Sequence, residues 1–239
     1  MGFYRGPNIV TDGLVYAIDA GSERSYPGSG TAVTAITGVG NGTLQNGIGF
    51  DSANGGSWTF DGVDQYVDFG SNFLLPGVAQ FDTITELTID VWVNYDAFVS
   101  SGANSQIISW WKTGGSTYAD GFLGITIGGA GTAANPMIRF GDGWANTGVT
   151  FTASTDVNKW FHIVAVKTSN NAYLYVNGVL KSTKGSALSF GFNEFPSLGR
   201  QNLAGEYLDG DISNIKLYNQ ALTATEVLQN YNAQKTRFI

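Results

Sequence analysis

Closely spaced Asx-Gly pairs are the feature that most constrains the fold of this chain. Such pairs accept the positive φ angles that tight hairpin turns require. The segments between them are short and alternate between apolar and polar residues, which is typical of an antiparallel all-β sandwich or barrel. The nine pairs lie at residues 12–13, 41–42, 46–47, 54–55, 61–62, 120–121, 142–143, 177–178 and 209–210.

The clearest strand is predicted at Glu86–Tyr95, where alternation gives two different faces. One face is apolar and is expected in the core: Leu87, Ile89, Val91, Val93 and Tyr95. The other is half polar and is expected outside the core: Glu86, Thr88, Asp90, Trp92 and Asn94. Further strands are predicted at Leu14–Asp19, Ser57–Phe60, Gln65–Phe69, Gln106–Lys112, Phe122–Ile127, Met137–Phe140, Lys159–Thr168, Ala172–Val176, Val179–Ser182 and Ile212–Tyr218.

One helix is predicted, at Ala224–Ala233, with Thr223 as its N-cap and Glu226 completing a capping box. Its apolar stripe would dock on the sandwich and consists of Val227, Leu228 and Tyr231. No linker or internal repeat divides the chain. We therefore expect a short N-terminal arm at residues 1–12 and a single domain at residues 13–239.

Composition excludes several classes of function. The net charge is −7 and there is no Lys/Arg cluster, so neither nucleic acid nor an anionic membrane surface is an expected partner. There are no cysteines, which excludes disulfides and thiolate chemistry, and the single histidine, His162, excludes a multi-histidine metal site. No apolar run is long enough to span a bilayer, and because the first 13 residues show no apolar h-region and no small-residue cleavage site, we expect no signal peptide.

Several segments, taken in chain order, resemble the concanavalin A-like lectin/glucanase superfamily in its laminin-G-like branch. The resemblance implies two antiparallel sheets in a jelly-roll-like sandwich with a short C-terminal helix, often with one structural Ca²⁺. It leaves function open, because this fold hosts lectins, glycosidases and adhesion modules. The segments are residues 14–21, 60–67, 87–93, 159–166, 173–178 and 210–223 followed by Glu226.

The two ends of the chain carry a narrower resemblance. Residues 5–14 and 26–30, together with residues 228–233, are similar to lectin-like domains in structural proteins of tailed phages. This resemblance implies a virion component that assembles in the host cytoplasm.

An enzymatic reading depends on three alternating positions. Glucanases of the superfamily carry Glu-x-Asp-x-Glu, whereas the corresponding positions here are Glu86, Thr88 and Asp90. A retaining mechanism needs two carboxyl groups about 5–5.5 Å apart. Because the middle acid is missing, we expect no catalysis, and we expect His162 to be a buried strand residue rather than a base.

The resemblance implies calcium ligands near the first and last strands, and Asp19 and Asp211 are the candidates. Carboxylate and carbonyl oxygens are the ligands that Ca²⁺ prefers. The acid usual in the closing strand of this branch is replaced here by Ser213. The alternative is that both aspartates cap turns.

Carbohydrate binding would use aromatic rings beside planar polar groups. Trp92 shares a strand face with Asp90 and Asn94, and Trp111 and Trp144 lie in or near predicted loops. These five residues form the candidate glycan site. The alternative is that the aromatic residues close the sandwich or pack against another subunit.

The sequence therefore predicts a non-catalytic, lectin-like structural or adhesion protein, exposed on a phage particle as a decoration, fibre or capsid-associated component. The expected partners are other virion subunits, a second copy of the chain, or a cell-surface glycan. A free carbohydrate-binding module is the main alternative and a glycoside hydrolase the next.

The first dozen residues raise a separate question, because Phe3, Tyr4 and Arg5 are residue types enriched at interfaces. This arm, with the tail Arg237–Ile239, could anchor the domain to a neighbouring subunit. The alternative is that it packs back onto its own sandwich.

Overall fold

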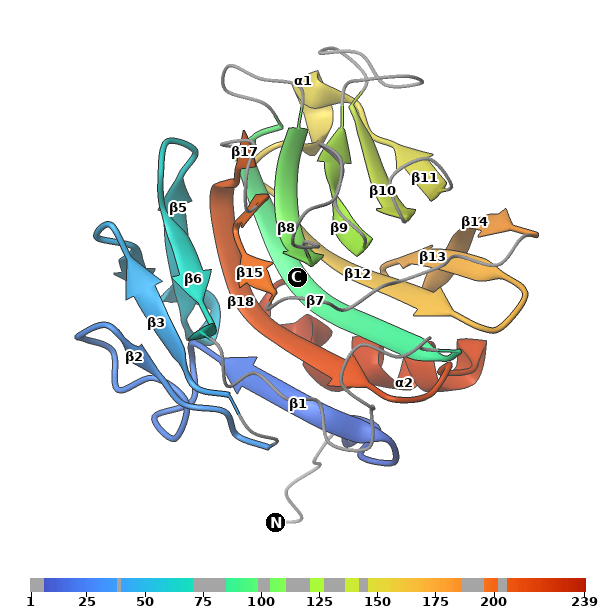
Figure 1. Cartoon of the computed structure of the whole chain (residues 1–239), viewed down its shortest axis with the longest axis horizontal. Helices are drawn as coiled ribbons and strands as arrows, with labels where there is room; N and C mark the ends of the chain where they lie inside the picture. Colours follow the sequence, from blue (N-terminus) through green and yellow to red (C-terminus); the bar gives the residue numbers. More distant parts are fainter. Residues whose placement is uncertain are drawn as a thin grey trace.

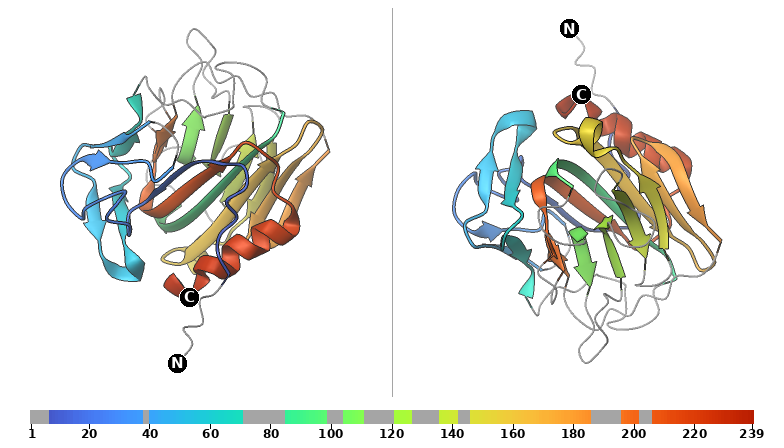
Figure 2. Two further views of the ribbon diagram at one scale, coloured as in Figure 1. Left: turned by 90° about the horizontal axis from the view of Figure 1, so that it is seen from below. Right: turned by 90° about the horizontal axis from the view of Figure 1, so that it is seen from above.

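The computed structural model describes two antiparallel β-sheets packed face to face, with a helix against the outer face of one of them (Figures 1 and 2). These layers confirm the predicted all-β, two-sheet sandwich with one short C-terminal helix. The residues described are 7–37, 40–70, 85–98, 104–110, 121–126, 136–141, 146–185, 196–201 and 206–239.

The larger curved layer in Figure 1, here called sheet A, follows the order β14-β13-β12-β7-β18-β5-β4, with β1 added beside β18. Its strands are β1 (Leu14–Asp19), β4 (Gly49–Asp51), β5 (Ser57–Asp61), β7 (Leu87–Ala97), β12 (Trp160–Lys167), β13 (Ala172–Val176), β14 (Val179–Lys184) and β18 (Asp209–Tyr218).

The second layer, sheet B, follows the order β11-β10-β9-β8-β15-β6-β3-β2. Its strands are β2 (Ala32–Val33), β3 (Gly42–Gln45), β6 (Tyr66–Asp68), β8 (Asn104–Trp110), β9 (Gly121–Thr126), β10 (Met137–Gly141), β11 (Asn146–Thr150) and β15 (Ser197–Leu198). The remaining elements are the ribbon β16 (Arg200–Gln201) and β17 (Glu206–Tyr207), the 3₁₀ turns η1 (Ala53–Gly55) and η3 (Lys235–Arg237), and the helices α1 (Ala153–Asp156) and α2 (Ala224–Gln234).

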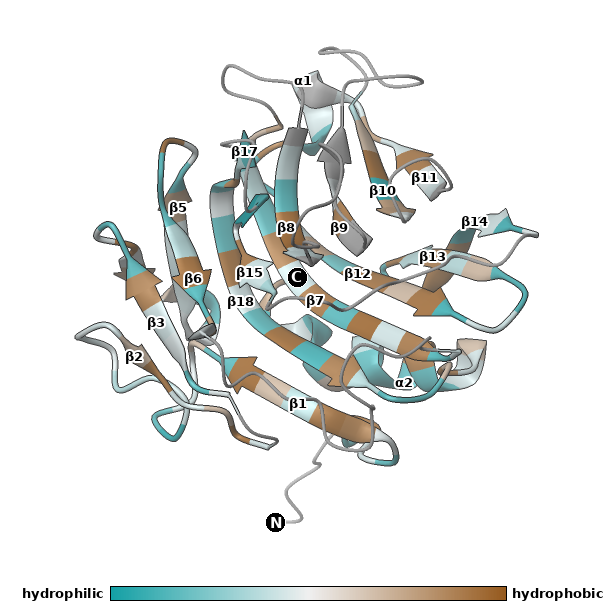
Figure 3. Cartoon of the chain, viewed as in Figure 1, coloured by the Kyte–Doolittle hydropathy of each residue, from teal (hydrophilic) through white to brown (hydrophobic). Residues whose placement is uncertain are grey.

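The main core lies between the two sheets. The apolar face predicted for β7 points into it, because Leu87, Ile89, Val91 and Val93 are fully buried. Alternating apolar and polar residues along β7 are visible in Figure 3. The aromatic residues Trp58, Phe60 and Phe140 fill this core from both sheets. Burial of such side chains contributes roughly 1.5–3 kcal/mol each.

The opposite face of sheet A is also covered. Helix α2 lies across it, while β8 and β9 lie on the other side of the same sheet (Figure 2). A second apolar cluster fills the space beneath the helix and consists of Val10, Val164, Val166, Tyr175, Tyr218, Leu222 and Val227. Sheet A is therefore the middle layer of three.

Most predicted strands form within two residues of their expected bounds, and β1 and β13 begin and end at the predicted residues. The short strands β2 to β4, the strand β11 and the helix α1 were not predicted. They have two to five residues, which is too few for a periodic pattern to emerge. The hairpin at Asn177-Gly178 has positive φ at both residues, 52° and 76°, as a two-residue turn of type I′ requires.

Helix α2 begins at its predicted N-cap, and the capping box is complete. The Thr223 hydroxyl accepts from the Glu226 amide at 3.3 Å, and Glu226 accepts from the Thr223 amide at 2.8 Å. The predicted apolar stripe is partly wrong, because Leu228 is 45% exposed while the polar Asn230 is fully buried. Asn230 points inward because it binds buried polar atoms of the sheet. Within the described residues, no helix is long and apolar enough to cross a membrane.

We expect Thr223→Ala to lower the free energy of unfolding by about 1 kcal/mol, because the substitution removes the cap of α2. Urea unfolding followed by tryptophan fluorescence measures the change. Thr236→Ala, at an exposed threonine after the same helix, is the matched control and should change stability by less than about 0.5 kcal/mol. Equal losses in the two variants would contradict the capping role.

Candidate functional site

The outer face of sheet A carries Trp92, Asp90 and Asn94, three of the five residues that the sequence marked for glycan binding. Strand register aligns them in rows across β12, β7 and β18. One row is His162, Trp92 and Asn214; the next is Val164, Asp90 and Lys216; the third is Val166, Thr88 and Tyr218. The prediction that Trp92, Asp90 and Asn94 share this face is therefore confirmed.

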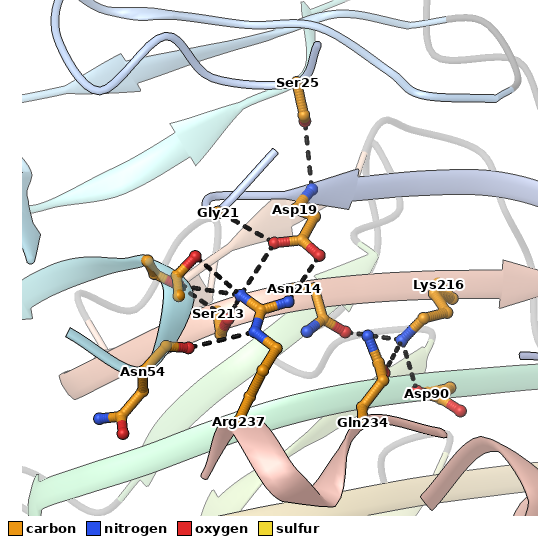
Figure 4. Close-up of polar contacts among 12 residues, drawn as sticks. Asp19, Gly21, Ser25, Asn54, Asp90, Ser213, Asn214, Lys216, Gln234 and Arg237 are labelled. Atoms are coloured by element: carbon orange, nitrogen blue, oxygen red, sulfur yellow. Dashed lines mark hydrogen bonds and ion pairs between the residues drawn. The ribbon is translucent and has the colours of Figure 1, made fainter. Parts of the chain in front are cut away.

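An ion pair is buried at the centre of this face. Asp90 is fully buried and its Oδ1 lies 3.1 Å from Lys216 Nζ and 3.2 Å from His162 Nε2. Its Oδ2 accepts a hydrogen bond from Asn230 of helix α2 at 2.8 Å. Lys216 also donates to Asn214 at 2.6 Å and to Gln234 of α2 at 2.8 Å, so its three N–H groups are all used (Figure 4).

Burial alone would raise the pKa of Asp90. The opposing effects are larger: the Lys216 and His162 charges, with hydrogen bonds from His162 and Asn230, hold the pKa of Asp90 well below its usual range. Asp90 is therefore ionised in the folded chain, and both of its carboxylate oxygens have polar partners: Lys216 and His162 at Oδ1 and Asn230 at Oδ2.

Trp92 lies beside this ion pair under the C-terminal segment. Its ring stacks on Phe238 with centroids 4.2 Å apart and on Tyr231 at 6.0 Å, and it is fully buried. The prediction that Trp92 and Asp90 contact a glycan is therefore wrong, because α2 and the tail cover them. Asn94, at the margin of the covered area, is only half-buried.

The side chains at the three positions weighed for catalysis form hydrogen bonds or ion pairs with other residues of the chain. Glu86 is exposed and accepts from the Ala221 amide at 3.3 Å. Thr88 is buried and bonded to Gln220 and Leu222. Asp90 lies in the buried ion pair, and His162 beside it is fully buried, as expected for a strand residue. Among these groups, only Glu86 is accessible to solvent.

Asp19, predicted as a calcium ligand, forms an ion pair with Arg237 near the C-terminus (Figure 4). The two N–O distances are 2.8 and 3.1 Å, in the forked arrangement typical of arginine with a carboxylate. The same guanidinium also contacts backbone carbonyls and the hydroxyl of Ser213.

Asp211, the other predicted ligand, lies elsewhere. It is half-buried on β18 and accepts from Asn94 at 3.3 Å. Burial raises its pKa to about 6; the Asp96 and Asp51 charges add to this, and hydrogen bonds from Asn94 and Thr59 oppose it.

The residues present do not fit the calcium site that the resemblance implies. Asp19 aligns with Asn214 of β18, three residues beyond Asp211. Within the described part of the chain, no three Asp, Glu or His side chains lie close enough to hold a metal ion. Both carboxylate oxygens of Asp19 already bind a cation, the guanidinium.

The ends of the chain pack onto the domain. Asn8 and Val10 bond to Gln229 and Asn230 of α2 at 2.8 and 2.7 Å. The tail is held through Arg237 and through Phe238, which is 9% exposed. The described part of the arm, from residue 7, and the tail thus follow the alternative of packing on their own sandwich; Phe3, Tyr4 and Arg5 lie outside the described residues, as do Trp111 and Trp144.

Sequence reasoning missed Lys216, Asn230 and Gln234, and it considered Arg237 only as part of a tail that could anchor the domain to a neighbour. Lys216 had a detectable signal, because it falls within an otherwise apolar closing strand, on the same face as Asn214. A lysine buried in a strand requires a carboxylate partner. The other three come from the helix and tail, and their contacts depend on how that segment docks.

A family model described as the concanavalin A-like lectin/glucanases superfamily matches residues 61–228. The chain belongs to this superfamily. The match covers more than half of the chain and confirms the resemblance seen in the sequence.

Solved structures agree on the fold. Trypanosoma rangeli sialidase in complex with sialic acid matches with a TM-score of 0.68 and 15% identity, over 96% of this chain and 34% of that one. The binding domain of botulinum neurotoxin DC in complex with SialylT matches with a TM-score of 0.67 and 13% identity, over 94% and 52%. The chain thus spans about a third of the sialidase and half of the toxin domain.

Another botulinum structure, the type G receptor binding domain, matches with a TM-score of 0.62 and 15% identity, over 93% of this chain and 52% of that one. At these identities the likeness establishes the fold. Among curated proteins, none matches the sequence significantly.

We expect Asp90→Asn to lower the free energy of unfolding by about 3 kcal/mol or more, because it leaves Lys216 buried without a countercharge. The double variant Asp90→Asn/Lys216→Met is the control and should recover most of the loss. Since the pKa of Asp90 is lowered by folding, its contribution is complete above pH 5 and is lost as the pH falls below 4. A loss that is unchanged at low pH would contradict the buried pair.

The ionisation of Asp211 should change stability with pH in the direction opposite to that of Asp90. Because folding raises its pKa to about 6, the folded chain loses stability as the pH rises from about 4 to about 6. Asp211→Asn should therefore gain about 1 kcal/mol at pH 7 and little at pH 4, since solvent partly screens this half-buried group. Urea unfolding at both pH values tests this, with the exposed Asp64→Asn as control.

Proposed function

We propose that this chain is a non-catalytic, lectin-like adhesion module. One observation carries the proposal: the sheet face on which the acidic residues of a glucanase would lie is covered by the chain's own C-terminal segment. A carboxyl group that protonates or attacks a glycosidic bond must touch the sugar. Asp90 has no exposed surface and is neutralised by Lys216. Its neighbour at the middle position is Thr88, which has no acid function.

The binding part of the proposal is supported by the fold family. Two of the similar structures are complexes, one with sialic acid and one with SialylT. A sialylated glycan is therefore the first ligand class to test. Since Trp92 and Asp90 are covered, the candidates that remain from the predicted site are Asn94, Trp111 and Trp144.

We propose that this module is part of the particle of a tailed phage, because its two end segments resemble those of phage structural proteins. The described parts of these segments lie against each other, through the contacts of Asn8 with Gln229 and Val10 with Asn230. They therefore act as one structural unit. Electron microscopy of the assembly that contains the chain tests this placement, and a free monomer in every fraction would refute it.

We expect the purified chain to bind sialylated oligosaccharides on a glycan array without releasing sugar. Trp111→Ala and Trp144→Ala should each weaken binding about ten-fold, because tryptophan supplies much of the contact energy in such sites. Phe50→Ala, at an exposed aromatic residue of β4, is the control and should leave binding unchanged.

Two outcomes would contradict the proposal. Binding to no glycan on the array would remove the lectin function. Release of reducing sugar or sialic acid that is abolished by Glu86→Gln would make the chain an enzyme, because Glu86 is the accessible carboxyl group of the three positions.

A further inference from the structure

Six oxygen atoms converge on the guanidinium group of Arg237, and we call them the oxygen cage (Figure 4). They come from three separate parts of the chain: the end of β1, the turn around η1 and strand β18. The cage consists of both carboxylate oxygens of Asp19, the carbonyl oxygens of Asn54, Gly55 and Gly56, and the hydroxyl oxygen of Ser213.

One nitrogen of the guanidinium has more acceptors than it can serve. Arg237 Nη2 lies 2.8 Å from Ser213 Oγ, 3.1 Å from Asp19 Oδ1, 3.1 Å from the Gly55 oxygen and 3.4 Å from the Gly56 oxygen. Nη2 carries only two hydrogens. Four oxygens around two hydrogens are the surroundings of a cation rather than those of a matched set of hydrogen bonds.

The cage oxygens are directed at this cation. The Ser213 hydroxyl donates its hydrogen to the Gly56 carbonyl at 2.8 Å, which leaves a lone pair of Ser213 facing Arg237. Carboxylate, carbonyl and hydroxyl oxygens are hard ligands of the kind that Ca²⁺ takes. The cage is therefore chemically a site for a hard cation.

The charge of the cage matches arginine. Asp19 supplies its single carboxylate, so the cage carries one negative charge and Arg237 supplies one positive charge. The site is partly desolvated, with the Asp19 and Arg237 side chains 19% and 25% exposed. A divalent ion in the same cage would leave one positive charge uncompensated.

The backbone is shaped for this close approach. A Cβ atom on Gly21 would lie 1.5 Å from the Gly55 oxygen and 2.7 Å from Arg237 Nη2. A Cβ atom on Gly55 would lie 2.8 Å from Arg237 Nε. Gly55 and Gly56 also have φ angles of 76° and 108°, which side chains disfavour. Three glycines thus let the segments close around the guanidinium.

We propose that Arg237 is the resident cation of this cage and occupies it in place of a metal ion. The stability of the domain is then independent of calcium. Removal of the guanidinium converts the cage into a site for a divalent cation that depends on Asp19.

The first measurement is the melting temperature of the full chain in chelator and in millimolar CaCl₂. The wild type should melt at the same temperature in both. Arg237→Ala should melt about 3–6 °C lower in chelator and regain several degrees in calcium. Lys235→Ala removes a positive charge two residues earlier and is the matched control, with no calcium response expected.

A second measurement reads the site directly. Tb³⁺ is a luminescent substitute for Ca²⁺ and is excited here through tryptophan. We expect no Tb³⁺ luminescence with the wild type and clear luminescence with Arg237→Ala. The variant Ser213→Asp/Arg237→Ala adds a second carboxylate to the cage and should bind calcium about ten-fold more tightly. Adding Asp19→Asn to Arg237→Ala should abolish the response, and adding it to Ser213→Asp/Arg237→Ala should weaken calcium binding about ten-fold, because one of two carboxylates is lost.

Each result of these two measurements either supports or overturns the proposal. A response to calcium or Tb³⁺ by either Arg237 variant, in melting temperature, folding yield or luminescence, supports the proposal if Asp19→Asn abolishes it in Arg237→Ala or weakens it in the double variant. A response that Asp19→Asn leaves unchanged places the ion elsewhere and overturns the proposal. No response by both variants overturns it as well, and so does calcium binding by the wild type that requires Asp19.

Discussion

Sheet A has two faces to bury, and only one of them meets sheet B. Its outer face carries Trp92, Tyr218, Val164 and Val166, too much apolar surface to leave in water. The same face carries Asp90 and Lys216, whose charges are costly to bury without partners. Helix α2 and the tail satisfy both demands, and the arrangement of the chain ends follows from them.

The way in which α2 docks follows from the buried pair. Asn230 donates a hydrogen bond to Asp90, and Gln234 accepts one from Lys216, so each charge of the pair is hydrogen-bonded to one polar residue of the helix. Apolar packing alone is not directional, whereas these hydrogen bonds fix the position of the helix along the sheet. Asn230 also accepts from the Val10 amide, which attaches the N-terminal segment to the same point.

The sequence was sufficient to predict the layers but not the covering of the outer face. Alternation in β7 and the turn at Asn177-Gly178 are local signals, and both predicted the structure correctly. The same alternation placed Trp92 and Asp90 outside the core, which is correct, but periodicity cannot say what lies above a face. Leu228 and Asn230 show why: they lie on opposite faces of helix α2, and the face that carries the asparagine is the buried one. Only the partners on the sheet decide between them.

The two ion pairs have different roles because their partners lie at different distances along the chain. Asp90 and Lys216 belong to neighbouring strands, so this pair joins parts of the sheet that are already held by backbone hydrogen bonds. Asp19 and Arg237 join the first strand to the tail, 218 residues apart, with no strand pairing between them. Trp92 is accordingly covered by two elements: Tyr231 of α2 stacks on it, and so does Phe238, which follows Arg237 in the tail. The outer face is thus closed by α2 and the tail together, and the Asp19–Arg237 pair attaches the tail to the first strand.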